Sequence, residues 1–308
     1  MASTEHASVM LEESMALLLP AGEDRQAVFV DATFGAGGHT EAILLRSRGS
    51  RVIALDADPA AVARAKDLAG RYPGRLDAVH ANYGRLGEAL DECGVHDVDG
   101  IMYDLGLSSL QLADTARGFS FAGVEPLDMR LDPTSNGPTA AQLLATKPER
   151  ELADIIENYG DERFARRIAR QITWRRERAP LQTTSDLVAA VLSAQPKGMP
   201  RARRGIHPAT RTFQALRMAV NDETRNLERS LETALQRVRS GGRVVAISFH
   251  SGEDRVVKRA FRDWTAAGRG DALTRKPLTP SEDEVAANPR ARSAKLRAIR
   301  IAENEQEA

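Results

Sequence analysis

The chain has 308 residues, of which 42% are hydrophobic and 28% are charged, and its 43 basic side chains are balanced by 43 acidic ones. No apolar run approaches the roughly 18 residues of a membrane-spanning helix, and the N-terminus lacks the basic-then-apolar order of a signal peptide. A single cysteine excludes a disulfide framework, and the six histidines lack metal-ligand spacing. We therefore expect a globular cytoplasmic protein with no membrane partner and no metal site.

Short apolar runs alternate with amphipathic stretches through the first third of the chain. The expected strands are residues 27–31, 51–56, 76–80 and 98–103, and residues 60–71 are expected as a helix between them. This alternation is typical of an α/β fold with a doubly wound parallel sheet.

Beyond Asp104 the strand pattern stops. The next expected elements are helices at 140–142, 149–159, 163–178 and 184–194, with loops near Pro133, at 136–138 and at 195–204. Later, residues 227–238 are expected as a helix, 240–242 as a turn, and 243–248 and 295–301 as strands. We therefore predict a helical domain, residues 113–213, inserted into an α/β domain made of residues 1–112 and 214–308.

A glycine-rich turn follows the first expected strand, where Asp31 precedes Gly35, Gly37 and Gly38. Glycine lets a backbone bend sharply and approach a ligand closely, so the turn predicts a nucleotide-type site, with a tight turn that binds nothing as the alternative. A carboxylate about 4 Å from a phosphate would cost on the order of 4 kcal/mol. Asp31 therefore argues against a dinucleotide and favours a cationic ligand such as S-adenosylmethionine.

Polar side chains follow other expected strands as well. Asp56 directly follows the second strand and is placed to accept hydrogen bonds from ribose hydroxyls, whereas Asp58 better fits the N-cap of the next helix. Asp104 ends the fourth strand and can accept a hydrogen bond from the ligand or from a substrate amine. Gln111 offers an amide that can read a ring edge, while Ser108 beside it is equally suited to capping a helix.

A strongly basic segment lies within the neutral chain. Residues 161–217 hold thirteen Lys and Arg against four Asp and Glu, a net charge of +9. Such a segment is either a solvated helix face or a footprint for a polyanion such as RNA. The candidates for phosphate or base contacts are Arg117, Arg130, Arg211, Gln214 and Arg217, of which the last three fall at three-residue steps along an expected helix.

Two aromatic residues near Arg117, Phe119 and Phe121, could stack on bases, but we favour packing against the protein. Asp128 and Arg130 could equally form a surface ion pair worth under about 1 kcal/mol.

Further polar residues crowd the end of the strand at 243–248. His250, Glu253 and Asp254 lie by geometry at the carboxyl edge of the sheet and are candidates for handling a proton. Of these, we predict His250 and Asp254 as catalytic residues. Arg255 is a further candidate for RNA contact. The alternative is that Glu253 and Asp254 only stabilise the dipole of a helix that begins there.

These stretches together closely resemble the bacterial rRNA cytosine-N4 methyltransferase family, the methyltransferase of the cell-division gene cluster. The resemblance runs from His6-Ala7-Ser8-Val9 to the stretch at 288–297, and so covers nearly the whole chain. It implies a Rossmann-like class I methyltransferase fold, S-adenosylmethionine as the methyl donor, and a decoding-centre cytidine (position 1402) of 16S rRNA in the small ribosomal subunit as the substrate. The implied donor-binding residues are Gly37, Gly38, His39, Asp56, Tyr83, Asp104 and Gln111. The oligomeric state stays open, with a homodimer as one option.

The chain departs from the family pattern at Gly252, where leucine is usual, which should loosen the start of that helix by roughly 1 kcal/mol. The D-P-P-Y signature common in amine-directed DNA methyltransferases is replaced by residues 104–107, Asp-Leu-Gly-Leu. The residue that polarises the target amine is therefore open between Asp104 and a carboxylate near His250, and the proton could pass to His250 or to water. An NAD-dependent oxidoreductase and a non-catalytic ribosome-assembly factor are the alternative functions.

Overall fold

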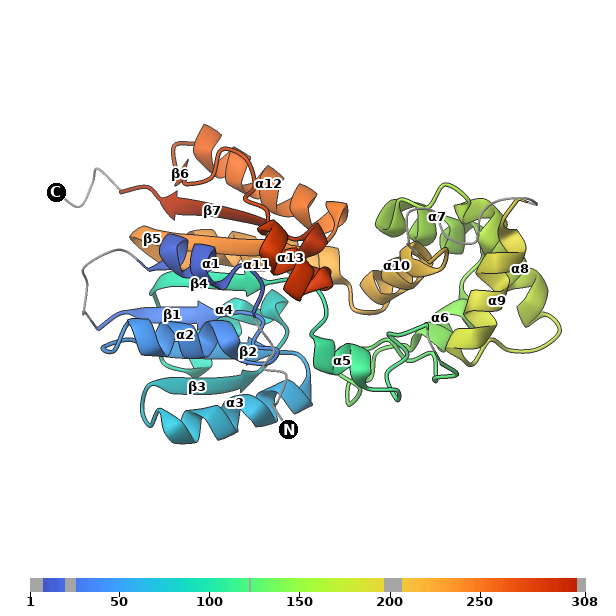
Figure 1. Ribbon diagram of the computed structural model, residues 1–308, viewed down its shortest axis with the longest axis horizontal. Helices are drawn as coiled ribbons and strands as arrows, with labels where there is room; N and C mark the ends of the chain where they lie inside the picture. The colour runs from blue at the N-terminus through green and yellow to red at the C-terminus, as the bar shows by residue number, and fades with distance from the viewer. Residues whose placement is uncertain (1–7, 20–25, 122, 197–206, 304–308) are drawn as a thin grey trace. The chain divides into compact units, whose positions relative to one another are not determined.

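The computed structural model describes residues 8–19, 26–121, 123–196 and 207–303 (Figure 1). The chain divides into two compact units, which we call the sheet unit, Met1–Gly106 with Thr224–Ala308, and the helical unit, Leu107–Glu223. The helical unit is wider at both ends than the predicted insertion at 113–213. The predicted loop at 195–204 falls mostly outside the described residues, as do His6 and Ala7.

The described residues of the sheet unit form a seven-stranded sheet with the order β3-β2-β1-β4-β5-β7-β6. The strands are β1 Val28–Asp31, β2 Arg51–Asp56, β3 Leu76–His80, β4 Val98–Asp104, β5 Val238–Ser248, β6 Gly270–Ala272 and β7 Lys295–Ile301. Strands β1 to β5 run parallel, whereas β7 is antiparallel to both β5 and β6. The order changes direction between β1 and β4, which is the point where ligands bind in open α/β sheets.

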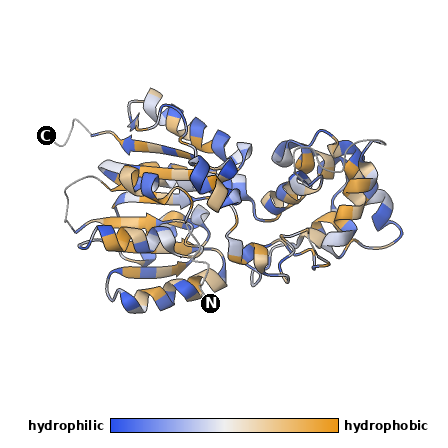
Figure 2. Ribbon diagram, viewed as in Figure 1, coloured by the Kyte–Doolittle hydropathy of each residue, from blue (hydrophilic) through white to orange (hydrophobic). Residues whose placement is uncertain are grey.

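Helices cover both faces of this sheet (Figure 1). Successive strand residues point to opposite faces, so Phe29 packs in the core beneath α1, α2 and α3, and Val30 in the core beneath α4, α11 and α12. The bounds are α1 Leu11–Leu18, α2 Gly38–Arg46, α3 Pro59–Arg71, α4 Leu86–Glu92, α11 Glu223–Arg237, α12 Ser251–Ala266 and α13 Glu282–Ala287. Figure 2 shows hydrophobic colouring concentrated on the strands, with hydrophilic stretches along α3 and α12. The predicted doubly wound α/β sheet is confirmed.

The predicted turn at 240–242 is wrong, because these residues belong to β5. The register between β4 and β5 shifts between the pairs Val98 with Val238 and Gly100 with Arg243, which marks a bulge. Gly241 has a φ of 77°, and a Cβ at position 242 would lie 2.8 Å from the backbone oxygen of Asp99. The glycines therefore allow the strand to bulge where the sequence pattern suggested that it ends.

The helical unit has a separate core. Its helices are α5 Ser109–Ala113, α6 Ala140–Thr146, α7 Glu149–Gly160, α8 Ala165–Arg176, α9 Thr184–Ala194 and α10 Thr210–Val220. Leu144, Ile156, Ile168, Leu187 and Leu216 are fully or almost fully buried in this core. Helix α6 is longer than the predicted 140–142 and α8 shorter than the predicted 163–178. Among the described residues, no helix is both long and apolar enough to cross a membrane.

Candidate active site

Polar side chains of the sheet unit collect where its parallel strands end. Strand β1 ends at Asp31, β2 at Asp56 and β4 at Asp104, while Tyr83 follows β3 and His250 follows β5. Parallel strands present their carboxyl ends at one edge of a sheet, so the fold alone brings these five positions to the same edge.

The glycine-rich turn after β1 is held by charged side chains from its neighbours. The Gly35 N–H donates to Asp56 Oδ2 at 2.8 Å, and the Gly35 carbonyl accepts from Arg64 Nη2 of α3 at 3.0 Å. The other carboxylate oxygen of Asp56 accepts from the Asp58 N–H at 2.9 Å, and burial raises the pKa of Asp56. Asp58 accepts from the Ala60 N–H at 3.0 Å, which confirms it as the N-cap of α3. Asp56 thus holds the turn in place.

Two glycines of the turn are required by contacts within the protein. Gly37 has a φ of 91°, and a Cβ there would lie 2.6 Å from Cζ of Phe34. A Cβ on Gly38 would lie 2.0 Å from Oγ of Ser8. The tight-turn explanation weighed from the sequence is therefore sufficient for these glycines, and the case for a ligand depends on the carboxylates beside them.

Asp31 is almost completely buried beside this turn, with 1% of its surface exposed. The Thr40 hydroxyl donates to its Oδ2 at 2.7 Å, and the Thr33 N–H donates to its Oδ1 at 3.1 Å. Burial raises the pKa of Asp31 to about 6 against these hydrogen bonds, and the charge of Asp56 adds to the rise. Asp31 is therefore a carboxylate held in a place where its negative charge is costly.

Asp104 is the most perturbed acid at this edge. Burial, together with the charges of Asp31 and Glu253, raises its pKa to about 8. Nδ1 of His39 lies 3.5 Å from Asp104 Oδ2, and burial lowers the pKa of His39 to about 4, so the imidazole is neutral at pH 7. Asp104 Oδ1 and His39 Nε2 are buried and have no hydrogen-bond partner among the described residues. Buried polar atoms without partners point to a ligand that supplies them.

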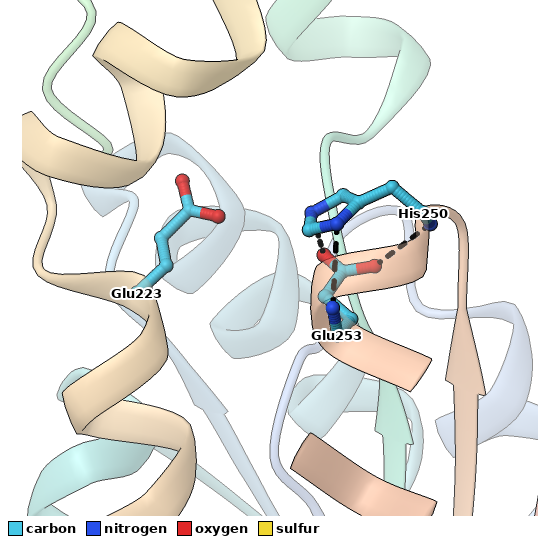
Figure 3. Close-up of side chains that lie close together, drawn as sticks. All are labelled: Glu223, His250 and Glu253. Atoms are coloured by element: carbon cyan, nitrogen blue, oxygen red, sulfur yellow. Dashed lines mark hydrogen bonds and ion pairs between the residues drawn. The ribbon is translucent and has the colours of Figure 1, made fainter. Parts of the chain in front are cut away.

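His250 and Glu253 form a reciprocal cap at the start of α12 (Figure 3). His250 Nδ1 accepts from the Glu253 N–H at 3.3 Å, which leaves the ring proton on Nε2, and Nε2 lies 3.0 Å from Glu253 Oε1. Glu253 Oε2 accepts from the backbone N–H of Phe249 at 2.8 Å. The imidazole is thus held in one tautomer, and the charge of Glu253, after that of Asp31, acts on Asp104.

Asp254, predicted to handle a proton, is instead used to join α12 to β7. Its Oδ1 accepts from Arg297 Nε at 2.7 Å, and its Oδ2 lies 3.3 Å from Lys295 Nζ. These two cations lower the pKa of Asp254 against the effect of burial. A carboxylate that is held ionised by two cations is a poor proton acceptor, so the geometry favours Glu253 over Asp254.

Two further predicted donor-site residues have clear structural contacts. The ring centroid of Tyr83 lies 6.4 Å from that of Tyr103 in an edge-to-face arrangement. Gln111 belongs to the helical unit, where its Oε1 accepts from the Ser108 N–H at 3.0 Å and its own N–H donates to Ser108 Oγ at 3.2 Å. The capping role considered for Ser108 is confirmed, and Gln111 completes that cap.

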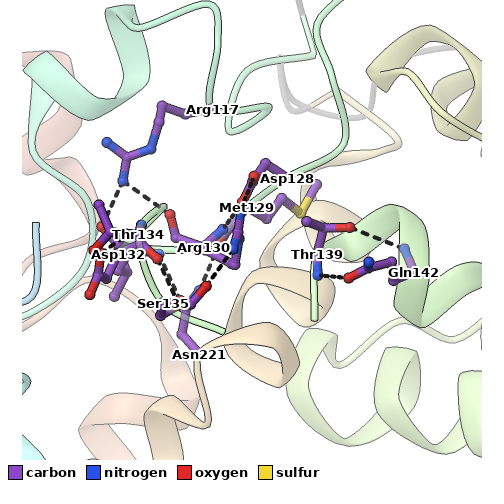
Figure 4. A network of polar contacts seen from close by, with 11 residues as sticks. Arg117, Asp128, Met129, Arg130, Asp132, Thr134, Ser135, Thr139, Gln142 and Asn221 are labelled. Carbon is purple, nitrogen blue, oxygen red and sulfur yellow. Dashed lines mark hydrogen bonds and ion pairs between the residues drawn. The ribbon is translucent and has the colours of Figure 1, made fainter. Parts of the chain in front are cut away.

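Arg117 and Arg130, predicted to contact RNA, both contact a loop of the helical unit (Figure 4). Arg117 is buried and donates to the carbonyls of Arg130 and Leu131 at 3.0 and 2.7 Å. Arg130 donates from Nε and Nη2 to the two carboxylate oxygens of Asp128 at 2.8 and 2.7 Å. This pair is largely buried, unlike the surface pair suggested by the sequence. The same loop is held by Asn221, which donates to the Met129 carbonyl at 2.7 Å.

The three predicted RNA-contact residues of α10 do not form one free polar face. Arg211 is exposed and donates to the Asp161 carbonyl at 2.8 Å, while Gln214 donates to the Tyr159 carbonyl at 3.1 Å. Arg217 forms two hydrogen bonds with the Glu223 carboxylate, at 2.8 and 2.7 Å. These contacts stabilise the helical unit.

The remaining predicted RNA-contact residue, Arg255, is exposed on α12. Phe119 is buried, in agreement with the packing role favoured for it. Phe121 stacks on His207 with ring centroids 4.6 Å apart, but its side chain stays exposed.

Comparison with known proteins shows the family of this chain. The model of the MraW methylase family matches residues 3–302. The chain belongs to the MraW methylase family. It is 49% identical to ribosomal RNA small subunit methyltransferase H of Thermomicrobium roseum, covering 96% of this chain and 93% of that protein. It is 45% identical to the protein of the same name from Acidiphilium cryptum, covering 96% of each.

Two residues of this MraW methylase were missed or undervalued by sequence reasoning. Arg64, which lies 26 positions beyond Gly38 in the chain, donates a hydrogen bond to the glycine-rich turn. No local sequence motif predicts such a contact. Glu253 does have a signal, because it follows His250 by three residues, which is the spacing of a capping box. That spacing distinguishes Glu253 from Asp254, its neighbour.

Proposed function

We propose that this protein transfers the methyl group of S-adenosylmethionine to the exocyclic N4 amine of a decoding-centre cytidine of 16S rRNA, acting in the cytoplasm on the small ribosomal subunit. Membership in a methylase family and near-full-length likeness to rRNA methyltransferases support this function. The observation that carries it is Asp104, whose pKa is raised by burial and by the negative charges of Asp31 and Glu253, at the sheet edge that also holds the glycine-rich turn.

The residues present fit this donor. S-adenosylmethionine supplies an electrophilic methyl group on a positively charged sulfur. A cation lowers the free energy of a cluster of buried carboxylates, which otherwise repel each other and raise each other's pKa. The unpartnered Asp104 Oδ1 and His39 Nε2 offer polar contacts to a ligand. We propose that Gly37, Gly38, His39, Asp56, Tyr83 and Asp104 of the sheet unit form the donor site.

Asp104 is the residue that we propose to act on the target amine. The lone pair of a cytosine amine is delocalised into the ring, and a hydrogen bond from the amine to a carboxylate favours the pyramidal nitrogen needed for attack. A carboxylate with a pKa near 8 can also take up the proton that the nitrogen loses. We propose that His250, whose Nδ1 accepts from the Glu253 N–H, relays that proton. Most of the rate would come from holding amine and methyl group in line.

The decisive experiment incubates the purified protein with small ribosomal subunits that lack the modification, using isotopically labelled S-adenosylmethionine. Mass spectrometry of nuclease fragments should place one labelled methyl group on N4 of a single cytidine. The Asp104→Ala variant should transfer none while remaining folded. Label on another nucleotide, or full activity of this variant, would contradict the assignment.

The two alternative functions are tested separately. Calorimetry with NAD and with S-adenosylmethionine distinguishes an oxidoreductase from a methyltransferase. A deletion strain distinguishes a non-catalytic assembly factor, because the wild-type gene should restore the missing methyl group and the Asp104→Ala gene should not.

A further inference from the structure

Helix α8 of the helical unit carries a row of exposed arginines. Among the residues from Ala165 to Arg176 there are five arginines and no acid. Arg163, Arg166, Arg167, Arg170 and Arg178, on or flanking the helix, are all exposed. Within the helix, Arg170 follows Arg166 by four residues and Arg167 by three, which places these three on one side, while Arg163 and Arg178 flank the helix at its two ends.

The opposite side of α8 is buried and uses its arginines differently. Ile168 and Ile172 are fully buried in the core of the helical unit. Arg176 Nη1 donates to the carbonyls of Leu144 and Lys147, and Arg175 Nη2 donates to Ser193 Oγ at 2.8 Å. Two arginines therefore join α8 to α6 and α9, and the exposed row has no such packing role.

The exposed arginines have little acidic compensation. Among the described residues, Arg170 has a long contact with Glu149, at 3.9 Å, and no ion pair involves the other four. The guanidinium carbon of Arg163 instead lies 4.4 Å from the ring centroid of Phe164. Of the neighbouring acids, Glu162 is buried and accepts from the Phe164 N–H, while Asp161 and Glu177 are exposed. A row of positive charge left uncompensated is what a polyanion would neutralise.

Trp174 extends the same side of the helix, four residues after Arg170. Its side chain is 48% exposed, which is unusual for so large an apolar group, and Arg178 lies 3.8 Å from its ring centroid. The chain has two tryptophans, and the other, Trp264, is buried in the sheet unit. An exposed indole next to a line of cations offers stacking and phosphate contact together.

We propose that this side of α8, which we call the α8 face (Arg163, Arg166, Arg167, Arg170, Trp174 and Arg178), binds an unpaired RNA strand, with a base stacked on Trp174 and its phosphates on the arginines. The inference rests on the proposed function, since it names the surface by which the helical unit holds the rRNA. Duplex RNA has its bases already stacked and offers Trp174 little, so the geometry favours a single strand.

The test measures binding of the full-length protein to a single-stranded RNA of about 12 nucleotides, a length within the range that stacking grooves cover. Trp174→Ala should weaken binding by about tenfold, and Trp174→Phe should retain most of it. RNA should quench tryptophan emission in the wild type and not in Trp174→Phe, because Trp264 is buried. Replacing Arg163, Arg166 and Arg167 together by Gln should reduce the slope of log affinity against log salt by about 2.

A matched control carries Gln at Arg48, Arg229 and Arg259, three exposed arginines of the sheet unit. The proposal that the α8 face binds RNA is overturned if this control loses as much affinity for the RNA as the α8 triple variant. It is also overturned if Trp174→Ala binds normally in a protein whose circular dichroism is unchanged, or if a duplex of equal length binds as tightly and quenches as strongly.

Methyl transfer to small subunits, measured on the same proteins, separates this inference from the proposed function. The α8 variants should raise the KM for subunits several-fold at unchanged affinity for S-adenosylmethionine. A wild-type protein that shows Trp174-dependent RNA binding but transfers no methyl group would contradict the proposed function alone. If the wild-type enzyme is active and every α8 variant keeps its KM for subunits, only the proposal for the α8 face is overturned.

Discussion

Asp104 is surrounded by groups that oppose its ionisation. Burial comes first, and the negative charges of Asp31 and Glu253 add to it, so its pKa is raised to about 8 and that of Asp31 to about 6. Two carboxyl groups therefore change charge between pH 6 and 8 in the free protein. A bound cation favours their ionised forms and so competes with protons for the same place.

Donor affinity should therefore depend on pH. Below pH 8 Asp104 holds a proton that the cationic donor must displace, so the affinity for S-adenosylmethionine should rise with pH from 6 to 8, by up to about tenfold per unit, and level off above 8. Titration calorimetry in two buffers of different ionisation enthalpy should record proton release. S-adenosylhomocysteine, whose sulfur is neutral, is the control and should show a weaker trend. Equal pH dependence for both compounds would contradict this explanation.

Neighbouring acids at the start of α12 should respond differently to substitution. Glu253→Gln removes the negative charge that lies 3.0 Å from His250 Nε2 and acts on Asp104, so we expect kcat to fall at least tenfold with little change in stability. Asp254→Asn leaves Arg297 without its ion-pair partner, so we expect a loss of about 3 kcal/mol in unfolding free energy with kcat retained at low temperature. Urea unfolding and steady-state kinetics measure both effects. The reverse pattern would return the proton-handling role to Asp254.

For single residues, the sequence predicted which side chains lie at the site better than it predicted what those side chains contact. Asp31, Asp56 and Asp104 were recognisable because each ends an apolar run, and strand ends of a parallel sheet share an edge. The partners of Arg117 and Arg211 were not recognisable, since a guanidinium that binds a distant carbonyl looks in sequence like one that binds phosphate.

The glycine-rich turn shows how one element combines backbone strain and close packing. Gly37→Ala adds a Cβ at a φ of 91° and within 2.6 Å of the Phe34 ring, so we expect a loss of about 2–3 kcal/mol in unfolding free energy and weaker donor binding. Gly74→Ala is the matched control, because Gly74 has a φ of 71° with no atom within 4 Å of the added Cβ. It should lose only about 1 kcal/mol. Equal losses in chemical unfolding would show that the Phe34 contact is unimportant.

Elements with strong periodicity were predictable and those defined by tertiary contacts were not. Strands β1 to β4 were predicted from short apolar runs that alternate with amphipathic stretches. The three-residue β6, in contrast, forms because it pairs with β7. The bulge in β5 was mistaken for a turn because glycine pairs in sequence suggest a chain reversal. A short stretch of sequence does not show whether a neighbouring strand continues to pair with it.

The whole molecule consists of two units with separate cores, and their stabilities should be separable. S-adenosylmethionine at 100 times its Kd should stabilise the sheet unit by about 2.7 kcal/mol. Ile168→Ala, in the core of the helical unit, should lower the stability of that unit by about 3 kcal/mol. Scanning calorimetry should show two transitions, one moved by the donor and the other by the substitution. A single transition that responds to both would show that the units unfold together.

The insertion between β4 and β5 also bears on the order in which the nascent polypeptide acquires structure. Strand β4, with the buried residues Ile101, Met102 and Tyr103, leaves the ribosome before its neighbour β5 has been translated, because Leu107–Glu223 comes between them. At ordinary elongation rates that delay lasts on the order of 10 s. For that period the half-built sheet presents an unpaired apolar edge of the kind that aggregates. Chaperone demand during synthesis should therefore be greatest in that interval and end once β5 emerges.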